Sequence, residues 1–187
     1  SSDLIRFSEP LAVFDFVENL SNKSPENQFK KLFQSSVFNN EQYNSVITEF
    51  DKLIIENTYD YSEYPYAQKI GGSTKSLLKK QLLNSKSLKE FEINSVGIVP
   101  NIYLFQLSAI LNKFTIVYQA LVYKPNKSNF ERQLRTIKDL VVSKNISSFL
   151  KKGITFYNSS WNNSIPFEII FYPLPNSKGF TATVFYN

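Results

Sequence analysis

The stretch from Pro100 to Leu121 reads PNIYLFQLSAILNKFTIVYQAL and decides the fold class. Apolar and aromatic residues recur along it in alternating steps of three and four: Leu104, Leu107, Leu111, Phe114, Tyr118 and Leu121. Because one face of an α-helix returns every 3.6 residues, this seam predicts a central helix of about six turns. Gln106, Asn112 and Lys113 interrupt the stretch, so it does not read as a bilayer-spanning helix.

Helical spacing continues on both sides of this seam. Ser8 and Ser24 can each cap a helix, and the prolines that follow them suit a first helical turn. The predicted helices cover 9–20, about 26–35, 41–57, a Lys-rich segment after Gly72, 87–93 and about 130–144, with a continuation toward Gly153. The segment 124–128, which contains Pro125, is predicted to be a turn.

The end of the chain changes from helical to strand periodicity. Every second residue over 167–171 and again over 180–186 is apolar or aromatic, as on one face of a strand, and the segment between them contains Pro, Asn and Gly. The fold class is therefore predicted to be mainly α, in one domain over 1–187. A body of about six to eight helices over 1–157 is followed by a C-terminal antiparallel β-hairpin over 166–187, and the class becomes α+β if further strands follow.

Composition excludes several classes of chemistry. The chain has 187 residues, 42% of them hydrophobic, and a net charge of +5. It contains no His and no Cys, which removes the usual zinc ligands, the Ser-His-Asp and Cys-His systems, haem, iron–sulfur clusters and disulfides. Lys75, Lys79, Lys80, Lys86 and Lys89 read as a solvated basic face, and no nucleic-acid-binding pattern accompanies them.

The two ends of the sequence bear on its compartment and length. The chain starts Ser1-Ser2-Asp3 and has no Met, which fits a processed or trimmed N-terminus, such as that of a mature chain after signal removal. A secreted, periplasmic or surface-anchored location is expected, and a cytoplasmic one stays open. The last strand runs into Asn187 with an unpaired edge, which indicates pairing with a partner or a continuation of the polypeptide.

Several segments together resemble a known family. They are Phe7-Ser8-Glu9-Pro10, Tyr64-Pro65-Tyr66, the segment from Phe156 to Trp161, the segment from Phe171 to Pro175, and Gly179-Phe180-Thr181-Ala182. They resemble the region upstream of the catalytic helix in bacterial zinc metallopeptidases of the HExxH, gluzincin-like type. The resemblance implies a helical half followed by strands that line a substrate cleft. Without His, no zinc-ligand role transfers to any residue, and zinc enters only with an HExxH segment downstream.

Candidate contact residues lie in an aromatic-rich segment over 59–66, which is predicted to be an ordered loop, and toward the C-terminus. Tyrosines offer an apolar face with a hydroxyl, which suits contact with a sugar or a peptide. The alternative is that these aromatic side chains hold the loop in place by packing against the helices. Trp161 is either a ligand platform or a packing staple, and the final strand can pair with an extended substrate. The candidate substrate-binding residues are Tyr59, Tyr61, Tyr64, Tyr66, Trp161, Thr181 and Thr183.

These observations leave two functions open. The first is a noncatalytic helical portion of a metallopeptidase-like bacterial protein that supports a substrate cleft. The second is a self-sufficient module that binds a peptide, a protein or a glycan. In both, the chain itself carries no catalytic residue and no cofactor, a peptide or protein substrate is possible, and no nucleic-acid partner is expected.

Overall fold

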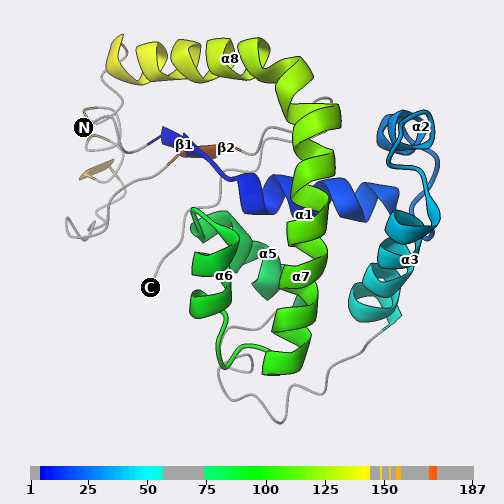
Figure 1. Ribbon diagram of the computed structural model, residues 1–187. Coiled ribbons are helices and arrows are strands. Elements are labelled where there is room, and N and C mark those ends of the chain that lie inside the picture. Colours follow the sequence, from blue (N-terminus) through cyan, green and yellow to red (C-terminus); the bar gives the residue numbers. More distant parts are fainter. Residues whose placement is uncertain are drawn as a thin grey trace. The chain divides into compact units, whose positions relative to one another are not determined.

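The computed structural model describes residues 5–56, 74–143, 148, 152, 155–156 and 169–171. As expected, the protein is mainly helical (Figure 1). The α-helices are α1 Glu9–Leu20, α2 Gln28–Gln34, α3 Glu41–Phe50, α5 Thr74–Asn84, α6 Leu88–Asn94, α7 Asn101–Tyr118 and α8 Lys124–Ser143. Two segments have the wider π-helical turn, η2 Asp51–Glu56 and η4 Gln119–Tyr123.

Helix α1 lies at the centre of the compact unit formed by residues 8–56 and 74–125. It contacts α2, α3, α5 and α7, and most of its side chains are buried. Ser8 caps its first turn by accepting a hydrogen bond from the Leu11 N–H at 3.4 Å, and the Ser8 hydroxyl donates to the Leu82 carbonyl at 3.1 Å. The predicted bounds of 9–20 therefore match α1, and its start is also fixed to α5.

Aromatic pairs join α1, α3 and α7 into one core. The Phe14 ring on α1 meets Phe50 on α3 with ring centroids 5.5 Å apart, in an edge-to-face arrangement. Phe16 meets Tyr118 of α7 at 6.0 Å. Such pairs add about 0.5–1.5 kcal/mol beyond the burial of their surface. The predicted central helix, α7, thus shares the centre of the core with α1.

Lys79 connects α5 to α1 through charge. Its Nζ lies 2.8 Å from Asp15 Oδ1 and 2.7 Å from Glu18 Oε2, and 5.4 Å from the centroid of the Phe14 ring. A cation above an aromatic face is attracted by the negative face of the ring. The prediction of a solvated lysine face is therefore wrong for Lys79, whose ammonium group binds two carboxylates of the neighbouring helix.

Helix α2 begins later than the sequence indicated. Asn27 is its cap, and its side-chain oxygen accepts hydrogen bonds from the N–H groups of Phe29 at 2.9 Å and Lys30 at 3.1 Å. The Ser24 hydroxyl donates instead to the Glu18 carbonyl at 2.6 Å. Ser24 therefore satisfies the C-terminal end of α1, where backbone carbonyls lack helical partners, and not the start of α2.

The turn predicted at 124–128 is absent, because α8 starts at Lys124 and runs through this segment. Pro125 is the second residue of α8, which follows α7 and η4 without a break, so it lies inside a continuous helical backbone. A proline ring clashes with the carbonyl four residues earlier in an α-helix. The wider π turn of η4 lies directly before Pro125, and local widening of this kind is a common way for a helix to accommodate a proline.

A short parallel pair of strands lies in the second compact unit of the chain. Strand β1, Ile5–Phe7, pairs with β2, Ile169–Phe171, in the register Ile5↔Ile169 and Phe7↔Phe171. The strand predicted over 167–171 is thus present in part, but its described neighbour is β1, which the sequence analysis missed. The second strand of the predicted hairpin, 180–186, lies outside the described residues.

Candidate functional site

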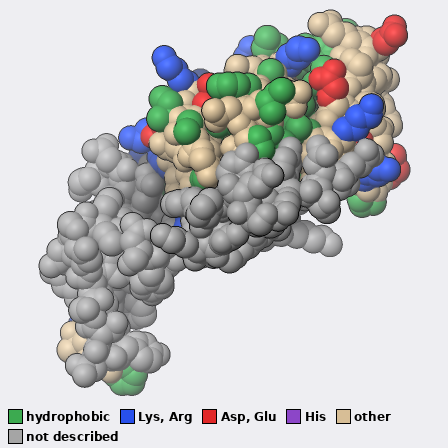
Figure 2. All heavy atoms as spheres, turned by 90° about the horizontal axis from the view of Figure 1, so that it is seen from below, with side chains coloured by type: hydrophobic (Ala, Val, Ile, Leu, Met, Phe, Trp, Pro, Cys, Tyr) green, Lys and Arg blue, Asp and Glu red, His purple; other side chains and the backbone are tan. Residues whose placement is uncertain are grey.

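One side of α7 exposes large apolar side chains to solvent. Ile102, Phe105 and Ile116 have exposed fractions of 71%, 59% and 64%. Because residues three or four positions apart share a helix face, Ala109 and Lys113 lie between them on the same side. We call these five residues the α7 strip. Figure 2 shows hydrophobic side chains among charged ones on the described part of one face of the molecule.

The composition of α7 explains why this strip is exposed. The seam residues Leu104, Leu107 and Leu111 are buried in the core, where α7 packs against α1, α3 and α6. Additional apolar residues occupy the opposite face, so the helix is apolar on more than one side. Helices of this kind are usually either fully buried or in contact with a partner. The strip is therefore a candidate contact surface.

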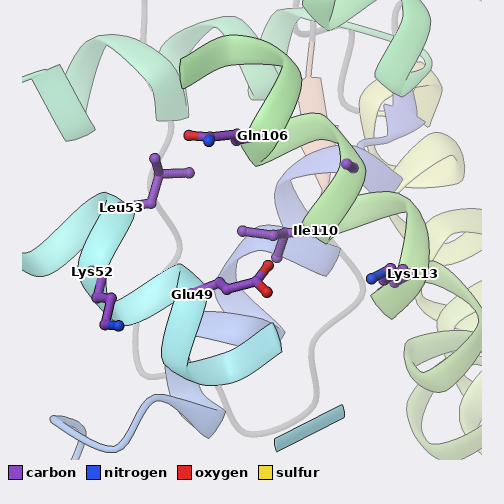
Figure 3. A pocket seen from close by; sticks show the side chains of 7 residues that line it. Glu49, Lys52, Leu53, Gln106, Ile110 and Lys113 are labelled. Carbon is purple, nitrogen blue, oxygen red and sulfur yellow. The ribbon is translucent and has the colours of Figure 1, made fainter. Parts of the chain in front are cut away.

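A pocket of about 340 Å³ opens beside the α7 strip (Figure 3). Its walls come from α3, η2 and α7, and its volume falls within the range of about 300–1,000 Å³ that is typical of ligand sites. Leu53 and Ile110 are buried and supply apolar surface. The remaining lining residues are Glu49, Lys52, Gln106, Ala109 and Lys113. Figure 3 shows Gln106 and Leu53 facing each other across the pocket.

The charges at this pocket are available to a ligand. Lys52 and Lys113 are exposed, and neither forms an ion pair with another described residue. Glu49 contributes one carboxylate, which Figure 3 shows pointing toward Ile110. Two ammonium groups against one carboxylate give the rim a small positive excess, which attracts an acidic group in a ligand.

A buried carboxylate fixes the start of η2 beside this pocket. Asp51 is only 3% exposed, and its Oδ2 accepts hydrogen bonds from the backbone N–H of Asn22 at 3.0 Å and from the Asn22 side-chain amide at 2.9 Å. A charged acceptor strengthens such bonds, which offsets part of the energetic penalty of burying the carboxylate. Asp51 thereby ties η2 to the loop after α1, and it sets the backbone position of Lys52 and Leu53.

Among the described residues, Tyr118 has the pKa that its surroundings shift most clearly. The side chain is fully buried in the core, and burial raises the pKa of its hydroxyl far above the ordinary value, with further contributions from Glu9 and Tyr123. The hydroxyl therefore stays neutral across the physiological pH range. Its role is that of a core residue with a polar end.

The candidate residues from the sequence all lie outside the part of the chain that the structure describes. The tyrosine loop falls within 57–73, Trp161 within 157–168, and the terminal strand within 172–187. Their contact roles therefore stay predictions. The residues concerned are Tyr59, Tyr61, Tyr64, Tyr66, Trp161, Thr181 and Thr183.

The α7 strip was missed because the sequence analysis assigned apolar residues to the core by default. Ile102, Phe105 and Ile116 do not fall on the seam that begins at Leu104, and this displacement is the signal that could have revealed a second apolar face. The pocket could not be found in this way, because it combines side chains from η2 and α7, which are far apart in the sequence.

Among the residues that the structure describes, no three His, Cys, Asp or Glu side chains lie close enough together to hold a metal ion. None of the helices between residues 5 and 143 that the structure describes has the length and apolar character needed to cross a membrane. Comparison of the chain with protein-family models, with curated proteins and with solved structures found no match.

Proposed function

We propose that the chain is a noncatalytic binding module that holds an amphipathic helix of a partner protein against the α7 strip and the adjacent pocket. The observation that supports this function is the exposure of Ile102, Phe105 and Ile116 beside a pocket with apolar walls. Soluble proteins rarely leave a row of large apolar side chains in water without a partner.

The shape of the surface favours a helix as the partner. From Ile102 to Ile116 the strip extends about 21 Å, given a rise of about 1.5 Å per residue. A helix of similar length can lie along it and insert apolar side chains between those of α7. One large side chain of the partner enters the pocket near Leu53 and Ile110. An acidic residue of the partner meets Lys52 or Lys113, which fixes its direction.

Selection from a random peptide library tests this function. The full chain is used to select binders, and each binder is then measured against Phe105→Asp and Lys113→Glu. We expect the selected peptides to carry apolar residues at helical spacing with an acidic residue, and Phe105→Asp to weaken them at least about tenfold, because a charge at the centre of an apolar contact is poorly tolerated.

The matched control is Val37→Asp. Val37 is an apolar residue of 87% exposure outside α7, so this variant places the same charge on the surface away from the strip. It should leave affinity unchanged. Binders that are insensitive to Phe105→Asp, or equally sensitive to Val37→Asp, would show that recognition occurs elsewhere and would contradict the proposal.

A second candidate is the noncatalytic helical portion of a metallopeptidase-like bacterial protein. It is favoured by one observation: Phe7 and Phe171, which belong to two segments that carry the resemblance, are paired residues of β1 and β2. In this candidate the module supports a cleft for a peptide substrate, a hairpin follows over 166–187, and zinc is held by an HExxH segment beyond Asn187.

Sequencing of C-terminal peptides from the natively expressed protein tests this second candidate. An HExxH segment within roughly 40 residues of Asn187 is expected, because strand-to-helix connections are short. A native chain without paired His residues beyond Asn187 would remove the metallopeptidase candidate, and it would leave the binding module unaffected.

A further inference from the structure

The α7 strip is symmetric about its middle residue. Ala109 lies seven positions after Ile102 and seven before Ile116, and it lies four positions from both Phe105 and Lys113. The two ends of the strip are thus the same residue type, the centre is small, and a ring and an ammonium group occupy equivalent places. All five side chains are exposed. A surface with this pattern can bind a second copy of itself after a rotation of 180°.

A two-fold axis at Ala109 places two α7 helices side by side in opposite directions. Ile102 of one copy then meets Ile116 of the other, and Phe105 meets Lys113. At the axis the small side chain of Ala109 faces its own copy, so the two helix backbones can approach closely, because interaxial distance depends on the side chains at the contact. Every residue of the strip therefore has a partner in this arrangement.

Charge favours this direction over the parallel one. Lys113 forms no ion pair with a described residue, and in the antiparallel pair its ammonium group reaches the Phe105 ring, whose face attracts a cation. Each Lys113 lies four residues from the axis, so the two Cα atoms are about 12 Å apart along the helices, beyond the screening length of about 8 Å at physiological ionic strength. A parallel pair brings the two ammonium groups together, which is unfavourable.

We infer that the partner of the α7 strip is a second copy of this chain, in a symmetric antiparallel dimer. The inference rests on the function proposed above, and it identifies the partner helix as α7 itself. In the dimer, the Phe105 ring of the other copy takes the place of the acidic group expected at Lys113. Stable interfaces use about 20–30 residues on each side, and the strip supplies far fewer, so a dissociation constant in the micromolar range is expected.

Single cysteines test the pairing, because the chain contains no Cys of its own. Under mild air oxidation, Ala109→Cys should cross-link to itself. Ile102→Cys and Ile116→Cys should cross-link to each other when mixed and not to themselves, since like residues lie about 21 Å apart and a disulfide requires Cα atoms within about 7 Å. The matched control, Val37→Cys, lies outside α7 and should remain uncross-linked. Self-cross-linking of Ile102→Cys as fast as the mixed reaction would overturn the antiparallel dimer.

Sedimentation velocity of the full chain from about 5 to about 500 µM measures the dimer itself, because these concentrations span a micromolar dissociation constant. The parent chain and Val37→Asp should dimerise with rising concentration, and Phe105→Asp should stay monomeric with an unchanged helical circular dichroism spectrum. A dimer insensitive to Phe105→Asp would overturn the inference. So would a parent chain that stays monomeric, and if it still selected peptides that depend on Phe105, the proposed function would stand without the dimer. A monomeric chain with no such peptides would remove both.

Discussion

The same substitution at two phenylalanines separates the core from the proposed contact surface. Phe14 is fully buried and packs edge to face on Phe50, whereas Phe105 is 59% exposed. Phe14→Ala should destabilise the fold by about 3–5 kcal/mol, because it removes a buried ring and leaves a cavity. For a chain of this size, that corresponds to a decrease in melting temperature of about 10 °C. Phe105→Ala should change stability by no more than about 0.5 kcal/mol.

Urea denaturation followed by circular dichroism at 222 nm measures both variants against the parent chain. The spectrum should be dominated by helix, as the extent of α1 to α8 requires. If Phe105→Ala destabilised the chain as much as Phe14→Ala, the α7 strip would have to be covered in the folded protein. The proposal of a free binding surface on α7 would then fail, while the core described around α1 would still stand.

Three further predictions concern polar groups in the compact unit formed by residues 8–56 and 74–125. Above the ordinary tyrosine pKa of about 10, the unfolded chain loses the Tyr118 proton while the folded chain keeps it, so stability should decrease with rising pH by up to about 1.4 kcal/mol per pH unit. Tyr118→Phe should remove this part of the slope in denaturation series between pH 9 and pH 11, and an identical slope would contradict the burial of the hydroxyl. Lys79→Met should lower the free energy of unfolding by about 1–2 kcal/mol, with a smaller effect in high salt, as thermal melts at two salt concentrations would show. Asp51→Ala and Asn22→Ala should be non-additive in a double-mutant cycle, because each variant removes the hydrogen bond from the Asn22 side-chain amide to Asp51 Oδ2, and additive losses would argue against that bond.

Local signals in the sequence located most helices. The predictions that were wrong, of a helix start, a turn and a strand pairing, have identifiable physical causes. Ser8 and Pro10 placed the start of α1 correctly, because cap and first-turn proline agree there. At Ser24 the same signal predicted a wrong helix start, because the Ser24 hydroxyl donates to the Glu18 carbonyl at the end of α1. Pro125 was assigned to a turn because proline often ends a helix, yet here the helical backbone continues through it after the π turn of η4. The pairing of β1 with β2 depends on residues at opposite ends of the chain, which periodicity cannot detect.

The candidate sites were less accessible to sequence reasoning than the helices. The position of Phe105 off the α7 seam was visible in the sequence, but an apolar residue on a second face can equally be buried by a neighbouring element. Asp51 resembled any other acidic residue of an amphipathic helix, and only its bonds to Asn22 distinguish it.

The central position of α1 also affects how the chain folds as it is made. Its residues, Glu9–Leu20, leave the ribosome well before Asn101–Tyr118 of α7, with which they form the core. At synthesis rates of about 5–20 residues per second, Phe14 and Phe16 stay without their final neighbours for several seconds. Helix α1 can therefore complete its core contacts only after α7 has been synthesised. A ribosome-associated chaperone that covers short aromatic segments is expected to raise the yield of folded protein, and moving α1 behind α8 by circular permutation should reduce that dependence.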